Sequence, residues 1–443
     1  MRHHSRWLRL LAVLLGLSMF AAACGDDDDT EAGEEGGQEE AEGGEESLAP
    51  PTGDADPQCQ GDSDGTLTIG GLLPQTGDLS FLGPPEEAGA ALAVQEINEA
   101  GGVLDQDVVF RPGDSGDEAP DIANPTVDEH LQNDADVILG AAASGVSLNV
   151  IDKVVGACKI HFSPANTSPQ FTEYDDDDLY FRTAPSDVLQ GQVLADLMIE
   201  DGVATAAIPA RQDSYGEGLQ EFTTLPFEEQ GGEVVAAPVY DPEAQSFEAE
   251  VDEIVSADPD ALVLIGFAES SRILSALIEQ GFTPDEKMIY MVDGNIGNAF
   301  GENFTEPGAL VGVRGTLPAA EITDEFRGRL DEVDPNLQDY SYGPETYDAV
   351  IITALAAIAA ETDDPAEMAR QINGVTRDGE ACETFADCRA LLEDGTDIDY
   401  NGPSGPQDFS LPGEPTAASF AVQSYGEDNR IDDSLTEYRQ AQF

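Results

Sequence analysis

Apolar and polar residues along most of this chain follow a pattern that predicts strands and helices in alternation. From Thr66, the run TLTIGGLLPQTGDLSFLG indicates a buried strand and a loop rich in Gly and Pro, and an amphipathic helix is expected over about 85–100, ending at Gly101 and Gly102. The alternation continues with strands expected at 108–110, 137–139 and 160–162, and helices at 124–133 and 146–155. Strands that alternate with helices are typical of a doubly wound parallel sheet.

A second set of alternating elements begins after residue 183 and predicts a second α/β domain of similar build. Its expected strands are 205–208, 234–240, 261–265 and 288–292, and its expected helices are 186–200, 216–230, 247–256 and 269–280. A further helix, 345–360 (ETYDAVIITALAAIAA), is apolar on nearly every side, which predicts that it is buried. The fold class predicted from the pattern is α/β, with two doubly wound parallel sheets.

The composition changes this picture mainly through charge. The chain has 443 residues, enough for two or three domains, with 90 Asp and Glu against 18 Lys and Arg and a formal net charge of −72. This charge disfavours nucleic acid or anionic lipid as a partner of the folded surface. With lysine at only three positions, 153, 159 and 287, the acid excess also suggests a high-salt habitat, where salt screens the self-repulsion. A stability that fell when salt was added would contradict that hypothesis.

The first residues have the features of a signal peptide. A basic start, a short apolar run and small residues come in that order: Arg2, Arg6 and Arg9, then 10–20, then Ala21, Ala22 and Ala23. The apolar run is too short to be taken first as a membrane span. Small residues directly before Cys24 resemble the lipobox of bacterial lipoproteins, which implies removal of 1–23, lipidation of Cys24 and an extracytoplasmic protein anchored to the cell membrane. The alternative is an ordinary secretory peptide with an incidental Cys.

An acidic segment follows the predicted cleavage point. Residues 25–64 contain sixteen acids and no bases, with Gly, Gln, Ser and Pro among the rest. Low hydrophobicity and high like charge prevent a packed core, so a disordered, self-repelling tether is expected over 24–64.

Four further cysteines, an even number in an exported protein, predict disulfides. Three pairings are possible. The close spacing in CETFADC favours Cys382–Cys388, which leaves Cys59–Cys158 to join the start of the folded chain to the first domain.

The sequence gives little support for metal or catalytic chemistry, and no cofactor is expected. Beyond the signal peptide only His130 and His161 are present, and neither has the spacing of a zinc motif. The motifs HExxH and GxxxxGK[ST] and the nucleophile elbow are missing, so an enzyme is not expected. Ser144 lies in a turn with Gly on both sides, but the sequence places no His beside it as a catalytic base.

Two turns that follow neighbouring predicted strands carry small and hydroxyl residues. GAAASG follows strand 137–139 and contains Ser144, and SPANTSP follows strand 160–162 and contains Thr167. Ligands of parallel α/β sheets bind beyond the carboxyl ends of the strands, where hydroxyls and helix N-termini can hold an anion. The alternative is that Ser144 and Thr167 are helix caps or turn residues.

Several stretches, taken together in their order and spacing, resemble one known family. They are LPQTGDLSFLG, AVQEINEAGGV, SPANTSP, YFRTAPSD, QDSYGEGL, ADPDALVLIG and ETYDAV. They resemble the Leu/Ile/Val-binding family of solute-binding proteins, over roughly residues 66–425. The resemblance implies the type I periplasmic-binding fold, in which two α/β domains are joined by three crossing strands and the ligand binds between them.

By this resemblance the crossings are expected near 182–184, 314–317 and 408–411. Domain one then comprises 66–183 and 316–409, and domain two 184–315 and 410–443. Helix 345–360 is expected in domain one.

The resemblance also implies the ligand-binding residues. Ser144, Ala165 and Thr167 match those that hold an amino acid's carboxylate, and Asp293 matches an acidic residue, Glu in the relative compared, that holds its ammonium group. An Asp before a Gly is also a common turn residue. In domain two, Tyr215 is expected to close over the ligand and Phe267 to replace a Tyr; Leu82 and Tyr342 are weaker candidates for the side-chain pocket, with core packing as the alternative.

The function implied is binding of a branched-chain or related amino acid for an ABC importer. The expected partner is a membrane permease, and the binding protein itself is expected to be a monomer. Domain one is expected to bind the ligand first and domain two to close over it. The alternatives are an amide, urea or aromatic acid as ligand, or a ligand-sensing module.

Overall fold

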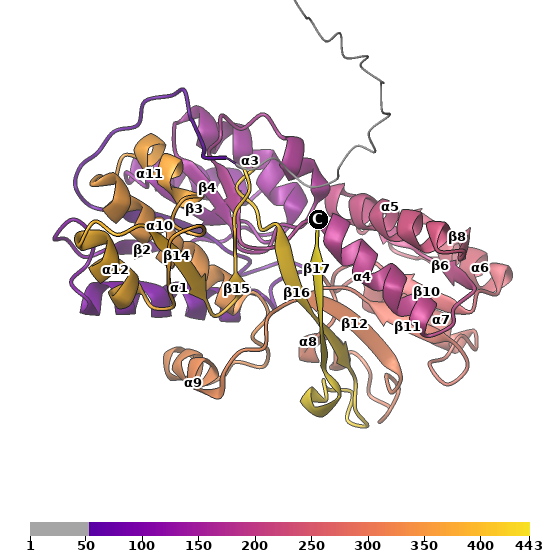
Figure 1. Cartoon of the computed structure of the whole chain (residues 1–443). Coiled ribbons are helices and arrows are strands. Elements are labelled where there is room, and N and C mark those ends of the chain that lie inside the picture. Colours follow the sequence, from indigo (N-terminus) through magenta and orange to yellow (C-terminus); the bar gives the residue numbers. More distant parts are fainter. Residues whose placement is uncertain (1–52) are drawn as a thin grey trace, which may run out of the picture. The chain divides into compact units, whose positions relative to one another are not determined.

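The computed structural model describes residues 53–443, which all fall within one compact unit (Figure 1). The predicted signal peptide, the lipidation of Cys24 and the tether up to residue 52 lie outside the described residues. Among residues 53–443, no helix combines the length and the apolar character that crossing a membrane requires.

The first lobe is built on a five-stranded parallel sheet of order β2-β1-β3-β4-β5. The strands are β1 Thr68–Leu72, β2 Val109–Arg111, β3 Val137–Gly140, β4 Ile160–Ser163 and β5 Tyr180–Arg182. The connections hold helices α1 Gly83–Glu99, α2 Ala123–Gln132 and α3 Ser144–Gly156 and the 3₁₀ helix η1 Pro169–Glu173. The alternation predicted from the sequence is confirmed here, with small shifts at the element ends.

Successive residues of these strands face opposite sides of the sheet, and each side has its own core. Val137 and Leu139 pack in the cluster that contains α1 and α10, whereas Ile138 packs with α2 and α3. Helices therefore cover both faces, as a doubly wound sheet requires.

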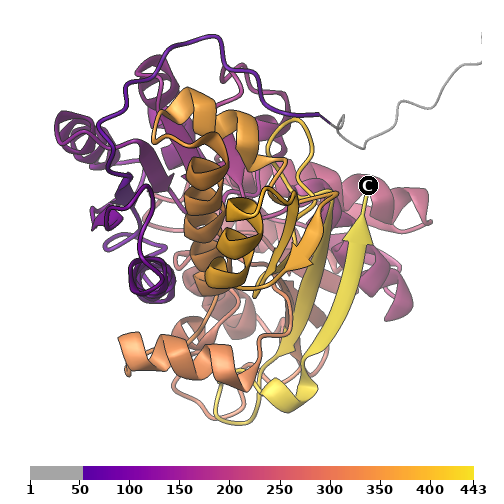
Figure 2. The same ribbon diagram turned by 60° about the vertical axis from the view of Figure 1, so that its left-hand side comes forward.

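A later part of the chain completes the first lobe. It comprises α9 Asp324–Val333, α10 Gly343–Ala360, α11 Pro365–Ile372 and α12 Phe385–Glu393, with a small sheet of β13 Glu380–Cys382, β14 Ile398–Gly402 and β15 Gly405–Pro406. Helix α10 lies between α1, α11 and α12, and it is buried along most of its length (Figure 2). The predicted burial of an all-round apolar helix is confirmed, because neighbours cover it on every side.

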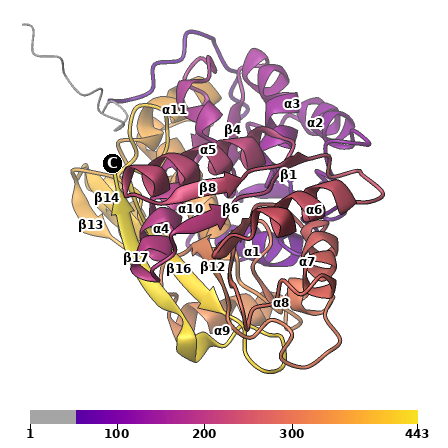
Figure 3. The ribbon, with the colours of Figure 1, turned by 90° about the vertical axis from the view of Figure 1, so that its right-hand side faces the viewer.

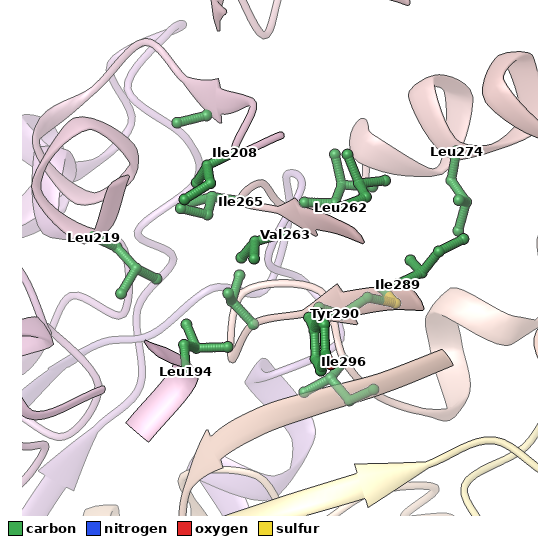
Figure 4. Packing of buried hydrophobic residues seen from close by; sticks show 14 of the residues in the cluster. Leu194, Ile208, Leu219, Leu262, Val263, Ile265, Leu274, Ile289, Tyr290 and Ile296 are labelled. Carbon is green, nitrogen blue, oxygen red and sulfur yellow. The ribbon is translucent and has the colours of Figure 1, made fainter. Parts of the chain in front are cut away.

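The second lobe is built on a seven-stranded sheet of order β17-β16-β12-β11-β10-β6-β8. Its strands are β6 Thr205–Ala207, β8 Glu233–Ala236, β10 Ala261–Leu264, β11 Met288–Met291, β12 Val313–Pro318, β16 Ala417–Ser424 and β17 Glu437–Gln442. The helices are α4 Asp187–Glu200, α5 Ser214–Glu229, α6 Glu248–Ala257, α7 Ser270–Glu279 and the short α8 Asn298–Gly301, with the 3₁₀ helix η2 Asp433–Leu435 (Figure 3). The core between sheet and helices combines aliphatic and aromatic side chains, and Leu262, Val263 and Ile289 from the strands lie in it with Leu274, Leu194 and Tyr290 (Figure 4).

Two sequence-based expectations for the second lobe differ from the structure. The sheet is mixed, because β16 pairs antiparallel with both β12 and β17, and the sequence pattern does not predict this hairpin. The single strand expected at 234–240 is wrong: β8 ends at Ala236, and Val239–Tyr240 forms β9, which pairs with β7, Ala210–Arg211. Pro238 lies between the two strands and has no N–H to continue the ladder, while its carbonyl accepts a hydrogen bond from the Ala210 N–H at 3.0 Å.

The lobes are joined by three crossings, as the type I periplasmic-binding fold requires. The first follows β5, the second follows β12 and the third lies between β15 and β16. The second crossing lies later than expected, since residues 314–317 are still part of β12 and pair with β11 and β16. The expected division between 315 and 316 therefore cuts a strand of the second lobe; the other domain limits stay predictions.

Both expected disulfides are present, Cys59–Cys158 and Cys382–Cys388. The first belongs to a segment that contradicts the expected tether: residues 53–64 are packed on the first lobe. Asp177 accepts hydrogen bonds from the Gln58 and Cys59 N–H groups, both at 3.1 Å, and Ala55 is buried. Composition alone predicted disorder here, but carboxylates of the folded lobe satisfy the backbone of this segment.

Candidate functional site

All eight residues expected from the sequence to bind the ligand line one small cavity between the lobes. They are Leu82, Ser144, Ala165, Thr167, Tyr215, Phe267, Asp293 and Tyr342, joined by Leu79, Ala142 and Gly294. The free space between the lining atoms is about 240 Å³, of which about 10 Å³ admits the centre of a water molecule. The structure thus brings the predicted residues together; their roles toward a ligand stay predictions.

The first lobe contributes hydroxyl groups at the ends of β3 and β4. Ala143, not Ser144, is the N-cap residue of α3, and the Ser144 hydroxyl instead accepts a hydrogen bond from the Ser168 N–H at 3.3 Å. The Thr167 hydroxyl is buried and has no protein partner by hydrogen-bond geometry. The capping alternative is therefore wrong for Ser144, and both side chains are placed where a ligand's anionic group can be bound.

Ala165 has a more limited role in this arrangement. Its N–H already donates to the Ser163 hydroxyl at 3.2 Å, and the same hydroxyl accepts from the Asn166 N–H at 2.9 Å. Ala165 contributes apolar surface to the cavity in this form of the protein.

The second lobe contributes Asp293, which follows β11 and is only 4% exposed. Its Oδ1 accepts hydrogen bonds from the Tyr215 hydroxyl at 2.6 Å and the Gln190 side-chain amide at 2.8 Å, and its Oδ2 accepts one from the Tyr342 hydroxyl at 2.7 Å. Burial raises the pKa of Asp293, and the tyrosyl hydrogen bonds oppose that rise. Asp293 is thus a buried group that lines the cavity and does not point into solvent.

Sequence reasoning missed two residues of this site, Asp187 and Gln190, both in the first turn of α4. The Gln190 amide donates to Asp187 Oδ1 at 3.0 Å as well as to Asp293, so it bridges the two carboxyl groups. Burial, followed by the nearby charge of Asp293, raises the pKa of Asp187 well above its usual value. The only local signal was the i, i+3 spacing in SDVLQ, which also fits an ordinary helix start.

Asp187 also contacts Thr167 of the first lobe. Its N–H donates to the Thr167 carbonyl at 2.8 Å, and the Thr167 hydroxyl lies close enough to its carboxyl to lower the pKa of that group. Asp187 Oδ2 is buried and has no protein partner by hydrogen-bond geometry. Asp293 is therefore the one carboxyl group among the residues that line this cavity, and Asp187 lies behind the lining, linked to Asp293 through Gln190.

Aromatic and aliphatic side chains form the remaining walls. The rings of Tyr215 and Phe267 stack with their centroids 5.3 Å apart, and Leu79 and Leu82 face them from the first lobe. Tyr342 precedes α10 in the left-handed region, with φ of 60°, a conformation uncommon for a residue with a side chain. No Lys or Arg lines this cavity among the described residues, so no basic side chain of the wall competes with a bound cation for Asp293.

Comparison with known proteins agrees with this geometry. The periplasmic binding protein family matches residues 66–409, and the chain belongs to that family. A chemotactic signal transduction system substrate-binding protein, BasB of Halobacterium salinarum, is 25% identical over 377 residues, which cover 81% of this chain and 86% of that protein. A Leu/Ile/Val-binding protein homolog of Brucella melitensis is 26% identical over 348 residues, 76% of this chain and 89% of its own length.

Solved structures share the fold. The branched-chain amino acid transporter substrate-binding protein LivJ of Streptococcus pneumoniae, in complex with isoleucine, aligns with a TM-score of 0.68 at 20% identity, over 85% of this chain and 99% of its own. The leucine-binding protein LivK of Thermotoga maritima aligns with a TM-score of 0.70 at 21% identity, over the same shares. The architecture is therefore that of type I periplasmic binding proteins, a class of substrate-binding proteins and not of enzymes.

Proposed function

We propose that this protein captures a zwitterionic amino acid, branched-chain or related, in the interdomain cavity and delivers it to an ABC importer. The observation that carries the proposal is the polarity of the cavity. Hydroxyl groups of Ser144 and Thr167 line its first-lobe end, and the carboxyl group of Asp293 lines its second-lobe end. A free amino acid carries a carboxylate and an ammonium group that match these two ends.

The ammonium group has several acceptors in this arrangement. The Tyr215 and Tyr342 hydroxyls donate their hydrogens to Asp293, which leaves lone pairs on both phenol oxygens. An ammonium group placed beside them has three donors for these oxygens and for Asp293 Oδ2. It also offsets the repulsion between Asp293 and Asp187, because both are buried without a cation in the cavity wall.

The apolar walls favour a small aliphatic side chain. Leu79, Leu82 and Ala142 lie on the first lobe, and the Phe267 ring lies on the second. Phe267 has no hydroxyl to offer a polar side chain.

Closure of the two lobes is the proposed binding mechanism. Ser144 and Thr167 belong to the first lobe, whereas Tyr215 and Asp293 belong to the second. A ligand therefore contacts residues of both lobes only when the lobes meet. The Tyr342–Asp293 hydrogen bond also joins the lobes. A ligand that binds the closed form more tightly shifts the population toward it, and the closed form is the one expected to dock on the permease.

The proposed location is outside the cytoplasmic membrane, with a monomeric protein anchored through lipidated Cys24. The two disulfides support an oxidising compartment, and the periplasmic binding family agrees with it.

A sensing role is the second candidate, because the relative BasB is described as part of a chemotactic signal transduction system. In that role the closed form would be read by a membrane receptor in place of a permease. The cavity chemistry is the same in both roles. Co-purification of the lipid-anchored protein with a permease or with a receptor distinguishes them.

A ligand screen tests the proposed binding. The purified protein is heated with amino acids, short amides, urea or aromatic acids, since a ligand that binds only the folded state raises the melting midpoint. We expect a rise with Leu, Ile or Val. A response confined to an amide, urea or an aromatic acid would overturn the zwitterion assignment.

A further inference from the structure

Arg211 is a buried cation beside the cavity wall that the proposed ligand contacts do not use. It lies on β7, is 7% exposed, and its guanidinium carbon is 3.6 Å from the centroid of the Phe267 ring. Within the second lobe its Nε donates to Asp213, and its Nη1 is 3.2 Å from Glu269 Oε2. Phe267 in turn stacks on Tyr215, so Arg211 supports the aromatic wall of the cavity from behind.

The Arg211–Asp213 turn lies where the second lobe meets the first. The Ser168 hydroxyl, from the first lobe, donates to the Ser214 carbonyl at 2.9 Å, at the first residue of α5. Pro169 packs against Gly218 one turn further along the same helix. These contacts place the start of α5 against η1 and the start of α3.

The first lobe presents two acids at this border. The Glu118 carboxyl occupies the space where a Cβ on Gly145 would lie, next to Ser144 of the cavity. Asp117 accepts a hydrogen bond from the Asp78 N–H at 2.9 Å. Burial raises the pKa values of Asp117 and Glu118, and the Arg211 guanidinium of the opposite lobe acts against that rise in both.

At this border the Arg211 guanidinium contacts carboxyl groups of its own lobe, and its charge also acts on two acids of the first lobe. Asp117 and Glu118 come from the first lobe, and Asp213 and Glu269 come from the second. Asp213 raises the pKa of Glu118 across the border, which shows that the acids of the two lobes repel one another there. When the lobes separate, this repulsion is relieved by distance and water.

We propose that Arg211 is a positioning residue that makes closure possible, by countering the acids that the two lobes bring together at the edge of the cavity. The proposal rests on the proposed function, because closure is the step that Arg211 serves. Arg211 does not touch the ligand cavity; it acts through the balance of charge between the lobes and through Phe267.

The test measures closure directly in the whole protein. Fluorescence energy transfer between labels at exposed positions of α2 and α6 reports the ratio of open to closed molecules, with and without leucine as the probe. At about 0.1 M salt, we expect Arg211→Gln to raise that ratio about tenfold, because the acids at the border lose the buried cation that offsets them. Arg211→Lys keeps the charge and is expected to restore most of the closure.

Two further variants separate charge balance from packing. Glu118→Gln added to Arg211→Gln removes an acid of the opposite lobe and is expected to bring the ratio back to within about threefold of the natural protein. Arg272→Gln is the matched control, because Arg272 also stacks on a ring of the second lobe, Phe247, at 4.7 Å. It is expected to leave closure unchanged.

Each outcome has a defined meaning. An Arg211→Gln protein that closes like the natural one, or a defect that Glu118→Gln does not relieve, would overturn the proposal and leave Arg211 as a packing residue. If leucine and the other amino acids fail to bind while the ligand-free ratio still responds to Arg211 and Glu118 as expected, the proposed function fails and the role of Arg211 stands.

Discussion

Asp293 and Asp348 are buried carboxyl groups of similar chemistry in different surroundings. Each accepts a hydrogen bond from a tyrosyl hydroxyl at 2.6 Å, Asp293 from Tyr215 and Asp348 from Tyr400. Asp348 lies on α10 inside the first lobe, where the Ser404 N–H at 2.8 Å and the Ser404 hydroxyl complete its bonding. Asp293 lies between the lobes, where Tyr342 of the first lobe and Gln190 of the second complete it.

The difference shows how a structural carboxyl group is distinguished from a candidate binding group. All partners of Asp348 belong to one lobe and stay with it when the lobes move. The partners of Asp293 come from both lobes and include the bridge to a second acid, Asp187. Burial and hydrogen bonding alone do not separate the two; the origin of the partners does.

The largest effect is expected from neutralising each carboxyl group in turn. Asp293→Asn should weaken amino acid binding by about a hundredfold, because the ligand's ammonium group loses a buried charged acceptor. Asp348→Asn should leave affinity unchanged. Isothermal titration calorimetry on both variants makes the comparison, and an equal loss of affinity in both would show that the effect is general destabilisation.

The pH dependence of stability should follow Asp348. Burial raises the pKa of Asp348 to about 7, above its unfolded value. A carboxyl group whose pKa is raised by folding stabilises the protein below its unfolded pKa, and this contribution is lost as pH rises through the folded pKa. Stability should therefore fall between about pH 4 and pH 7, and Asp348→Asn should flatten that slope in urea denaturation at a series of pH values. If the slope is unchanged in Asp348→Asn, the pH dependence of stability comes from another acid. Glu345 is one such acid, because burial raises its pKa to about 8.

Asp187 should matter less than Asp293, because it reaches the site through Gln190. Asp187→Asn keeps an oxygen for the Gln190 amide but removes an acid that a bound ammonium group would help to ionise. We expect affinity for an amino acid to fall about tenfold, with little change in affinity for an uncharged amide of similar size. Calorimetry with the two ligand types checks this, and equal losses for both would point to a packing role.

The smallest effect is expected from a pair of buried hydroxyl groups. Thr167 and Thr223 each have a buried hydroxyl with no protein partner by hydrogen-bond geometry, but only Thr167 lines the cavity. Thr167→Val should weaken amino acid binding about fivefold, whereas Thr223→Val should leave binding unchanged and raise stability by up to about 1 kcal/mol. Thermal denaturation with and without ligand measures both quantities. If Thr167→Val binds as well as the natural protein, the carboxylate of the ligand is held elsewhere.

Prediction from the sequence was most successful for features that depend on a single short segment of the chain. The alternation of strands and helices, the burial of α10 and the turns that hold Ser144 and Thr167 are properties of short stretches, whose residue spacing reports which face is covered. The family resemblance extended this to Tyr215, Phe267 and Asp293, and the structure places all three at one cavity.

Residue pattern and spacing are therefore enough to predict the order of the elements, the fold class and the disulfide between the two closely spaced cysteines. The folded arrangement is needed to see that Gln190 joins Asp187 to Asp293, which lies 103 positions after Gln190, and that the charge of Arg211 acts on Glu118 of the other lobe. It also decided the antiparallel C-terminal hairpin and the packing of residues 53–64. The physical reason is that these features depend on hydrogen bonds and charges between distant segments, which local periodicity does not encode.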